Sequence, residues 1–168
     1  MMHFTTQNKW RFRVIIHWLF STDTPAINHI NLGRSNLWCS FYAKAARLGL
    51  NEDNHKITTF SRARSLSIQS DSCNEDDLTK IPLNGFGEIE HIQVGNNCFR
   101  NIKNLILEGI QSLSRVEIGS NSFTKQTNGR SSDPSKYFSV TDCPHFETLT
   151  VGTYSFSDYS SFNATSIF

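Results

Sequence analysis

The sequence has no apolar run long enough to cross a membrane. A membrane-spanning helix needs about 20 apolar residues, whereas the run VIIHWLF at residues 14–20 is short and is interrupted by His17. Basic residues precede this run, as in a secretory signal, but no small-x-small cleavage site follows it in STDTPAI. The sequence therefore predicts no membrane span and makes a signal peptide the less favoured interpretation.

The chain also lacks an excess of charge of either sign. Its 16 Lys and Arg against 15 Asp and Glu give a formal net charge of +1, whereas nucleic-acid-binding proteins usually carry a strong basic patch. The segment KWRFRVIIHW at residues 9–18 mixes basic and aromatic residues. Its alternation favours the inner face of a strand over contact with nucleic acid or anionic lipid, so we expect no nucleic-acid partner.

Motifs that hold metals, phosphates or catalytic groups are missing. The four cysteines have no C-x-x-C spacing, the six histidines have no H-x-x-x-H or H-E-x-x-H spacing, and no glycine-rich phosphate loop is present. These absences argue against zinc, redox and nucleotide sites. The acidic segment NEDD at 74–77 is interpreted as a solvated loop, and His91 and His145 as solvated surface. The sequence predicts no enzyme, no metal and no cofactor.

A phrase of eleven residues occurs three times. It reads IEHIQVGNNCF at 89–99, LSRVEIGSNSF at 113–123 and FETLTVGTYSF at 146–156. Apolar residues hold its first, fourth, sixth and last positions, and glycine holds its seventh, as Gly95, Gly119 and Gly152. Self-similarity at a period of 20–50 residues indicates that the chain builds one supersecondary unit repeatedly.

A second, shorter pattern of apolar residues follows each phrase. It is Leu105-x-Leu107, then Phe138-x-Val140, then Phe162-x-Ala164. The middle copy is delayed by residues 124–136, which have no apolar side chain and are expected to form an extruded loop. An earlier, less regular copy contains Ala63, Leu66, Ile68, Cys73, Ile81 and Leu83.

The predicted fold is a β-rich solenoid of about 3.5 coils, each of roughly 24 residues, over residues 63–168. Alternation of apolar residues with a period of two indicates two short strands in each coil, and such coils bury their apolar faces only by stacking with parallel strands. The glycine is expected to allow a sharp turn with positive φ. The predicted core comprises Leu66, Ile68, Ile92, Val94, Phe99, Leu105, Leu107, Val116, Ile118, Phe123, Phe138, Val140, Leu149, Val151 and Phe156.

Residues that face outward are the candidate binding positions. Ser67, Gln93, Glu117 and Thr150 follow the first strand column, and Pro82, Ile106 and Ser139 follow the second. They could contact a peptide or loop of a partner, although a merely soluble face explains them equally well. With strands about 4.8 Å apart the face measures only about 17 Å by 20 Å, less than half of the roughly 800 Å² of a stable interface, so we expect weak binding.

The N-terminal segment 1–62 shows no clear repeat and is expected to mix strand and helix. Asn36 and Gly49 are suitable caps for a helix at about 37–48 that would cover the first coil. Alternatively, INHINLGRSNL at 27–37 fits the repeat phrase and is a decayed coil. Both interpretations stay open.

The phrase L-x-x-I-x-I-G-x-x-S-F, followed by L-x-L-x-G, resembles the leucine-rich repeat superfamily and most closely its BspA-like class of bacterial and protist surface proteins. The resemblance covers residues 63–168. It implies a curved, right-handed solenoid that serves as a non-catalytic scaffold for protein–protein interaction, here as a fragment of a longer array. The alternatives are a truncated or structural repeat protein with no specific ligand and, more distantly, a surface adhesion module.

The cysteines at 39, 73, 98 and 143 are interpreted as free thiols, because three of them occupy repeat positions expected to be buried or half-buried. Reduced thiols slightly favour a cytoplasmic location over a secreted or cell-surface one. A single glycosylation sequon at Asn163 is weak support for secretion. The sequence leaves the partner protein unidentified.

Overall fold

The computed structural model describes residues 29–32, 63–81, 88–125 and 132–165. These residues form eight strands and no helix: β1 (His29–Leu32), β2 (Ser65–Ile68), β3 (His91–Val94), β4 (Asn104–Glu108), β5 (Arg115–Ile118), β6 (Asp133–Thr141), β7 (Thr148–Val151) and β8 (Tyr159–Thr165). The expectation of a β-rich fold is confirmed for this part of the chain. The predicted helix at 37–48 lies outside the described residues.

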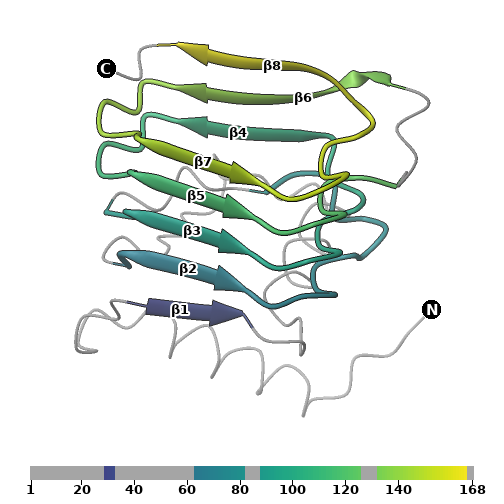
Figure 1. Cartoon of the computed structure of the whole chain (residues 1–168), viewed down its shortest axis with the longest axis horizontal. Helices are drawn as coiled ribbons and strands as arrows, with labels where there is room; N and C mark the ends of the chain where they lie inside the picture. Colours follow the sequence, from purple (N-terminus) through teal and green to yellow (C-terminus); the bar gives the residue numbers. More distant parts are fainter. Residues whose placement is uncertain (1–28, 33–62, 82–87, 126–131, 166–168) are drawn as a thin grey trace, which may run out of the picture.

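The strands form two sheets, and every pairing is parallel. Sheet A has the order β1-β2-β3-β5-β7, and sheet B has the order β4-β6-β8. From β3 onward the chain alternates between the two sheets, so that the strands of each sheet lie side by side like rungs (Figure 1). This arrangement follows from the sequence, because each phrase supplies one strand to sheet A and each shorter pattern supplies one strand to sheet B.

The apolar residues of successive phrases stand directly beside one another in sheet A. Leu66 pairs with Ile92, Ile92 with Val116, and Val116 with Leu149. The second column contains Ile68, Val94, Ile118 and Val151 in the same register. In sheet B, Leu105, Phe138 and Phe162 form a matching column. The period of two and the spacing of the phrases therefore predicted the register.

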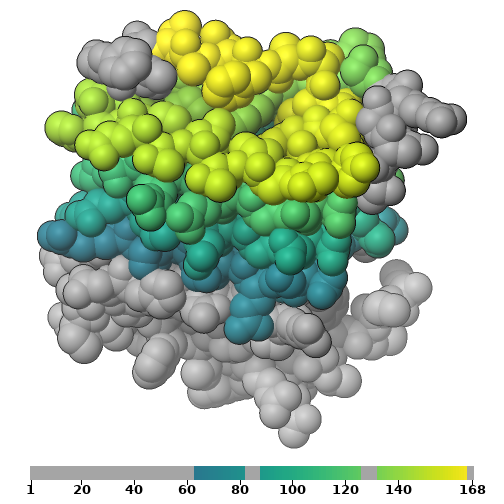
Figure 2. All heavy atoms as spheres, in the orientation of Figure 1, coloured from purple at the N-terminus to yellow at the C-terminus, as the bar shows by residue number. Residues whose placement is uncertain are grey.

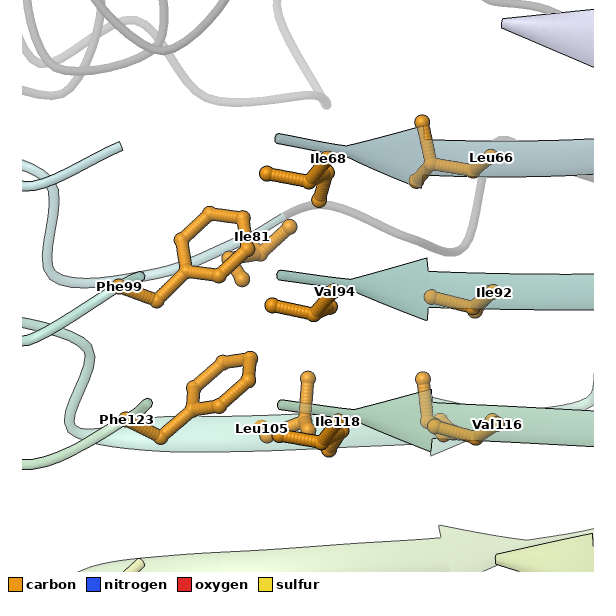
Figure 3. A pocket seen from close by; sticks show the side chains of 11 residues that line it. Leu66, Ile68, Ile81, Ile92, Val94, Phe99, Leu105, Val116, Ile118 and Phe123 are labelled. Carbon is orange, nitrogen blue, oxygen red and sulfur yellow. The ribbon is translucent and has the colours of Figure 1, made fainter. Parts of the chain in front are cut away.

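The core lies between the two sheets. Leu66, Ile68, Ile92, Val94, Val116 and Ile118 from sheet A and Leu105, Leu107, Phe138 and Val140 from sheet B are all buried. Phe99 and Phe123 close their phrases by pointing into this interior (Figure 3). The rings of Phe99, Phe123 and Phe156 stack with centroids 5.0 and 4.8 Å apart. Burial of these side chains is the main force that holds the sheets together.

Val151 was predicted in the core, but the structure exposes 43% of it. The prediction is wrong because β7 is the last strand of sheet A and has a neighbour, β5, on one side only. Leu149 and Phe156 are partly buried for the same reason. Ile118, the register partner of Val151, is 3% exposed because β7 covers it.

The turn glycines were expected to have positive φ, and this is also wrong. Among the described glycines only Gly109 has a positive φ, at 66°. A Cβ atom at Gly95 would lie 2.5 Å from the Ser70 nitrogen, and one at Gly152 would lie 2.5 Å from the Ser120 nitrogen. Glycine is required here because adjacent units approach closely, whereas positive φ falls on other residues of the turn.

Residues 124–136 were predicted as one loop, but β6 begins at Asp133 and includes the last four of them. Lys136, within this strand, is buried. Polar residues can extend a strand when a neighbouring strand pairs with them, and β8 pairs with β6 from Asp133 onward, with a register shift before Tyr137. Residues 126–131 lie outside the described part of the chain.

The N-terminal segment contributes a strand to the same sheet as the repeats. In β1, Ile30 pairs with Leu66 and the Leu32 backbone pairs with Ile68. Sheet A therefore continues across the boundary predicted between residues 62 and 63. Only residues 29–32 of the segment 27–37 are described, so its interpretation as a decayed coil stays a prediction.

Candidate functional site

Polar side chains cover the outer face of sheet A in two columns. The predicted column, Ser67, Gln93, Glu117 and Thr150, is in register on β2, β3, β5 and β7. A second column on the same face consists of Ser65, His91, Arg115 and Thr148. Sequence reasoning missed the second column. Its signal was present, since residues two positions apart on a strand share a face.

The carboxylate of Glu117 is the centre of this outer face. Gln93 Nε2 donates to Glu117 Oε2 at 3.4 Å, and Arg115 Nη1 lies 3.3 Å from Glu117 Oε1. His91 Nε2 lies 3.4 Å from Glu117 Oε2, but the two atoms make no hydrogen bond. Ser67 Oγ extends the row by donating to Gln93 Oε1 at 3.5 Å. The long contacts leave Gln93 and Glu117 able to exchange these partners for those of a ligand.

An open hollow lies beside this column where the strands of sheet A end. Gln93, Glu117 and Thr150 line it on one side, and the turns around Gly95 and Gly119 line it on the other. Its volume is about 410 Å³. The glycines let adjacent turns pack against each other, since a Cβ at Gly119 would lie 2.6 Å from the Gly95 carbonyl carbon, so this wall of the hollow is backbone.

The second predicted column lies on the opposite side of the molecule. Ile106 and Ser139 are neighbours on the outer face of sheet B, and Asn163, which sequence reasoning did not select, continues their row. The two sheets share one interior, so their outer faces point away from each other. The two predicted columns cannot form one site. Pro82 lies outside the described residues.

The cavity between the described strands of the two sheets is too small for a small-molecule ligand. One cavity of about 10 Å³ lies between the sheets, and its lining is hydrophobic, with Ile81 beside Phe99 and Phe123 (Figure 3). This volume is about that of one water molecule, and an apolar cavity of this size stays dry.

The acidic segment at 74–77 was interpreted as a solvated loop, but it is a turn held by hydrogen bonds. The Asn101 amide donates to the carbonyl oxygens of Asn74 and Glu75 at 2.9 and 3.0 Å. Asn74 in turn donates to the Asn97 carbonyl oxygen at 2.7 Å. Within the described ranges, no three His, Cys, Asp or Glu side chains are grouped as a metal site would require.

The expectation of free thiols is wrong for Cys73, which is disulfide-bonded. The argument from reduced thiols for a cytoplasmic location therefore does not hold at this position. Cys98 and Cys143 are free and buried. Burial raises the pKa of both thiols, so they stay protonated and are poor nucleophiles at neutral pH.

A buried ion pair lies where sequence reasoning expected only a loop. Lys136 Nζ donates to Asp158 Oδ2 at 2.7 Å, and the two side chains are 6% and 5% exposed. The Tyr159 ring lies 5.3 Å from Lys136 Nζ, and Tyr159 donates its hydroxyl proton to the Ile102 carbonyl oxygen at 3.0 Å. Burial, with a smaller effect of Asp158, raises the pKa of Tyr159. The cluster ties β6 to β8.

No helix within the described ranges is long and apolar enough to span a membrane. Comparison with known proteins gives no match to any protein-family model, to any curated protein or to any solved structure.

Proposed function

We propose that this chain is a leucine-rich repeat solenoid, closest to the BspA-like class, that acts as a non-catalytic scaffold and binds a protein partner on the outer face of sheet A. The observation that carries the proposal is the in-register polar column Ser67, Gln93, Glu117 and Thr150 beside the hollow at the strand ends. Two parallel sheets built from a recurring phrase support the fold assignment.

The chemistry of the outer face favours a polar, extended segment of the partner. Of the described residues, the exposed large hydrophobic ones are Tyr137, Val151, Tyr154 and Phe162, and only Val151 belongs to sheet A. An amphipathic helix needs an apolar groove to dock, whereas a peptide backbone or a polar loop can exchange hydrogen bonds with Gln93 and Glu117. The partner we propose is therefore a protein loop or extended peptide with basic or amide side chains opposite Glu117.

The small face implies weak, fast-exchanging binding. The four paired strands β2, β3, β5 and β7 are four residues each, which gives a face far below the roughly 800 Å² per partner of a standard interface. Each long, exposed polar contact contributes little to the free energy of binding. We expect such a module to act through several contacts at once.

The decisive experiment replaces Gln93 and Glu117 together by arginine. Both side chains point away from the core, so the melting temperature should stay nearly unchanged, while partners recovered by photo-crosslinking from Thr150 should be lost because like charge now faces a basic segment. The matched control is Ser139→Arg on the outer face of sheet B, which should leave crosslinking intact. If crosslinks from Thr150 persist in the double variant, or if Ser139→Arg abolishes them equally, the proposed face is wrong.

A further inference from the structure

Asn163 differs from the asparagines in the turns of sheet A by what its side-chain amide contacts. Asn97 donates to Asp71 Oδ1 at 2.9 Å, and Asn121 donates to Asn97 Oδ1 at 3.3 Å, so both tie adjacent units together. No hydrogen bond in the described part of the chain uses the side chain of Asn163. It lies within β8, although asparagine is depleted in strands. The packing of the described units therefore gives no reason for asparagine at this position.

The side chain of Asn163 points away from the interior whatever follows β8 in the chain. Phe162 pairs with the buried Phe138 and lies on the inward side of its strand. Asn163 comes next and therefore lies on the outer face of sheet B, beside its register partner Ser139. Ser139 has a strand on each side, β4 and β8, and is still partly exposed. A further strand beside β8 would leave Asn163 accessible in the same way.

The surroundings of Asn163 leave room for a bulky group. Ser161 and Thr165 lie two residues away on the same face of β8, and both are exposed, as Asn163 is. These side chains and that of Ser139 are short. Figure 2 shows the yellow segment that contains β8 at the surface of the molecule. A group attached to Asn163 would extend into solvent without displacing a packed side chain.

Residues 163–165 read Asn-Ala-Thr, the acceptor sequence for N-linked glycosylation. No other asparagine of the 168 residues is followed two positions later by serine or threonine. The acceptor sequence thus falls on an asparagine that is exposed, points outward and has no structural contact to lose. Modification at this position is compatible with the fold.

The disulfide at Cys73 is an independent observation, and it concerns the compartment. Cys73 is fully buried and disulfide-bonded. Disulfides form and persist in oxidising compartments such as the lumen of the endoplasmic reticulum, and they are rare in the cytosol. N-linked glycans are attached in that same lumen. A bond in the unit of β2 and a sequence on β8 therefore point to the same environment.

We propose that Asn163 is a glycosylation site and that the chain carries an N-linked glycan on the outer face of sheet B. The sugar donor is a lipid-linked oligosaccharyl diphosphate. Asn163 Nδ2 attacks the anomeric carbon of its first sugar, and an N-glycosidic bond forms while the bond from that carbon to the diphosphate oxygen breaks. The lipid diphosphate leaves, and the Nδ2 proton passes to a base of the host oligosaccharyltransferase.

This inference is independent of the partner face proposed above. The outer faces of the two sheets point away from each other, so a glycan on sheet B leaves the outer face of sheet A open to a protein partner.

Mass spectrometry of the full chain purified from the cells that produce it tests the proposal. The peptide that contains Asn163 should carry a glycan built on N-acetylhexosamine. Peptide-N-glycosidase should remove this glycan and leave an aspartate at that position. A peptide that is unmodified at Asn163 overturns the proposal.

Secretion of the full 168-residue chain from cultured eukaryotic cells, behind a cleavable signal, tests the acceptor itself. The wild type should carry a single glycan, which Asn163→Gln and Thr165→Ala should abolish. Thr165→Ser should keep it at least in part, because the acceptor sequence needs only a hydroxyl residue at this position. The matched control is Asn121→Gln, a turn asparagine outside any acceptor sequence, which should leave the glycan in place. A wild-type chain that is secreted without a glycan overturns the proposal.

The melting temperature supplies a readout of the geometry. Glycosylated wild type and Asn163→Gln should unfold at nearly the same temperature, since the glycan extends into solvent and asparagine makes no contact that glutamine would lose. If the glycosylated chain melted well below the Asn163→Gln variant, the outer face of sheet B would not accommodate a glycan, and the assignment of Asn163 would be wrong.

Discussion

The hydroxyl of Ser122 donates to the Gly95 carbonyl oxygen at 2.8 Å and accepts the Cys98 amide at 3.1 Å. Both partners belong to the preceding unit. One unit later, the Ser155 hydroxyl makes the same pair of bonds, to the Gly119 carbonyl oxygen and from the Ser122 amide. The serine before each of these two closing phenylalanines thus ties its turn to the turn before it, in addition to backbone bonds between the turns such as that from the Phe123 amide to the Cys98 carbonyl oxygen at 2.8 Å.

Ser122→Ala should lower the free energy of unfolding by about 1–3 kcal/mol, because it leaves a buried carbonyl and a buried amide without a partner. Ser122 is fully buried, so water cannot replace the hydroxyl without a rearrangement. Chemical denaturation measures the effect. The control, Ser120→Ala in the same turn, should change stability by less than about 0.5 kcal/mol. Equal effects of the two substitutions would mean that the tie contributes nothing.

Gly119→Ala should be far more destabilising than Gly109→Ala. A Cβ atom at position 119 would lie 2.6 Å from the Gly95 carbonyl carbon and 2.8 Å from the Asn96 nitrogen, both backbone atoms that cannot move aside cheaply. At Gly109 a Cβ meets nothing within 4 Å, and only the positive φ of 66° penalises it, which costs about 1–2 kcal/mol.

Thermal and chemical denaturation of both alanine variants checks this order. Gly109→Asn is a useful third variant, because asparagine tolerates positive φ better than alanine does and should recover part of the loss. If Gly109→Ala proved the more damaging of the two, close approach of adjacent units would not be the reason for the glycine of the phrase.

The repeat explains why much of this fold could be predicted from the sequence. Apolar residues with a period of two identify which side chains of a strand point inward, and a recurring phrase identifies which strands are neighbours. Together they gave the register that places Val94 beside Ile118. The outer residues follow by exclusion, because residues between the inward positions of a strand point to the other face, and this places Gln93 and Glu117 together.

The errors over Val151 and the phrase glycines have one physical origin, which is that a pattern gives the direction of a side chain but not its surroundings. Val151 points inward and is still exposed, because burial needs a following strand. Glycine was expected in the phrase because of a positive φ, whereas close contact with the adjacent turn is what requires it. Positive φ instead falls on Phe99 and Phe123, at 58° and 59°. Aromatic residues rarely adopt this conformation, so no sequence rule finds it. Cys73, at the same position of the earlier unit, has a φ of 60°, so the conformation belongs to the turn and not to the aromatic side chain.

Stability should fall at alkaline pH because of Cys98. Burial raises the pKa of this thiol above its ordinary value, so the folded state keeps the proton at a pH where the unfolded chain has released it. The contribution to stability is fully present below the unfolded pKa of about 8.5 and is lost as pH rises toward the folded pKa. Denaturation of wild type and Cys98→Ser over this range measures it.

Cys98→Ser should show a weaker fall in stability above that pH, since serine does not titrate there. Near neutral pH it should be close to wild type in stability, because Cys98 occupies the position of Ser122 and its Sγ already contacts the Gln69 carbonyl oxygen at 3.1 Å. Native-state alkylation gives an independent check: Cys98 should react only after unfolding. Rapid labelling of folded chain at neutral pH would contradict the assigned burial.

The buried pair Lys136 and Asp158 should behave differently from the surface pair Arg64 and Glu90. Asp158→Asn alone leaves the Lys136 charge buried without a counter-charge, and the free energy of unfolding should fall by about 3–5 kcal/mol. In the double variant Lys136→Met with Asp158→Leu, no buried charge remains, so we expect most of that loss to be recovered. Part of it should persist, because Asp158 Oδ2 also accepts the Lys125 amide at 3.3 Å.

The surface pair supplies the matched control for this cycle. Arg64 Nη1 and Glu90 Oε1 lie 2.9 Å apart, nearly as close as the buried pair, but their side chains are 61% and 47% exposed. Arg64→Met should therefore cost no more than about 1 kcal/mol. Chemical denaturation of the single and double variants measures how much the free energy of unfolding falls for the buried pair and for the exposed pair. If Asp158→Asn were as mild as Arg64→Met, water would reach the Lys136 ammonium, and the tie between β6 and β8 would depend on their backbone hydrogen bonds alone.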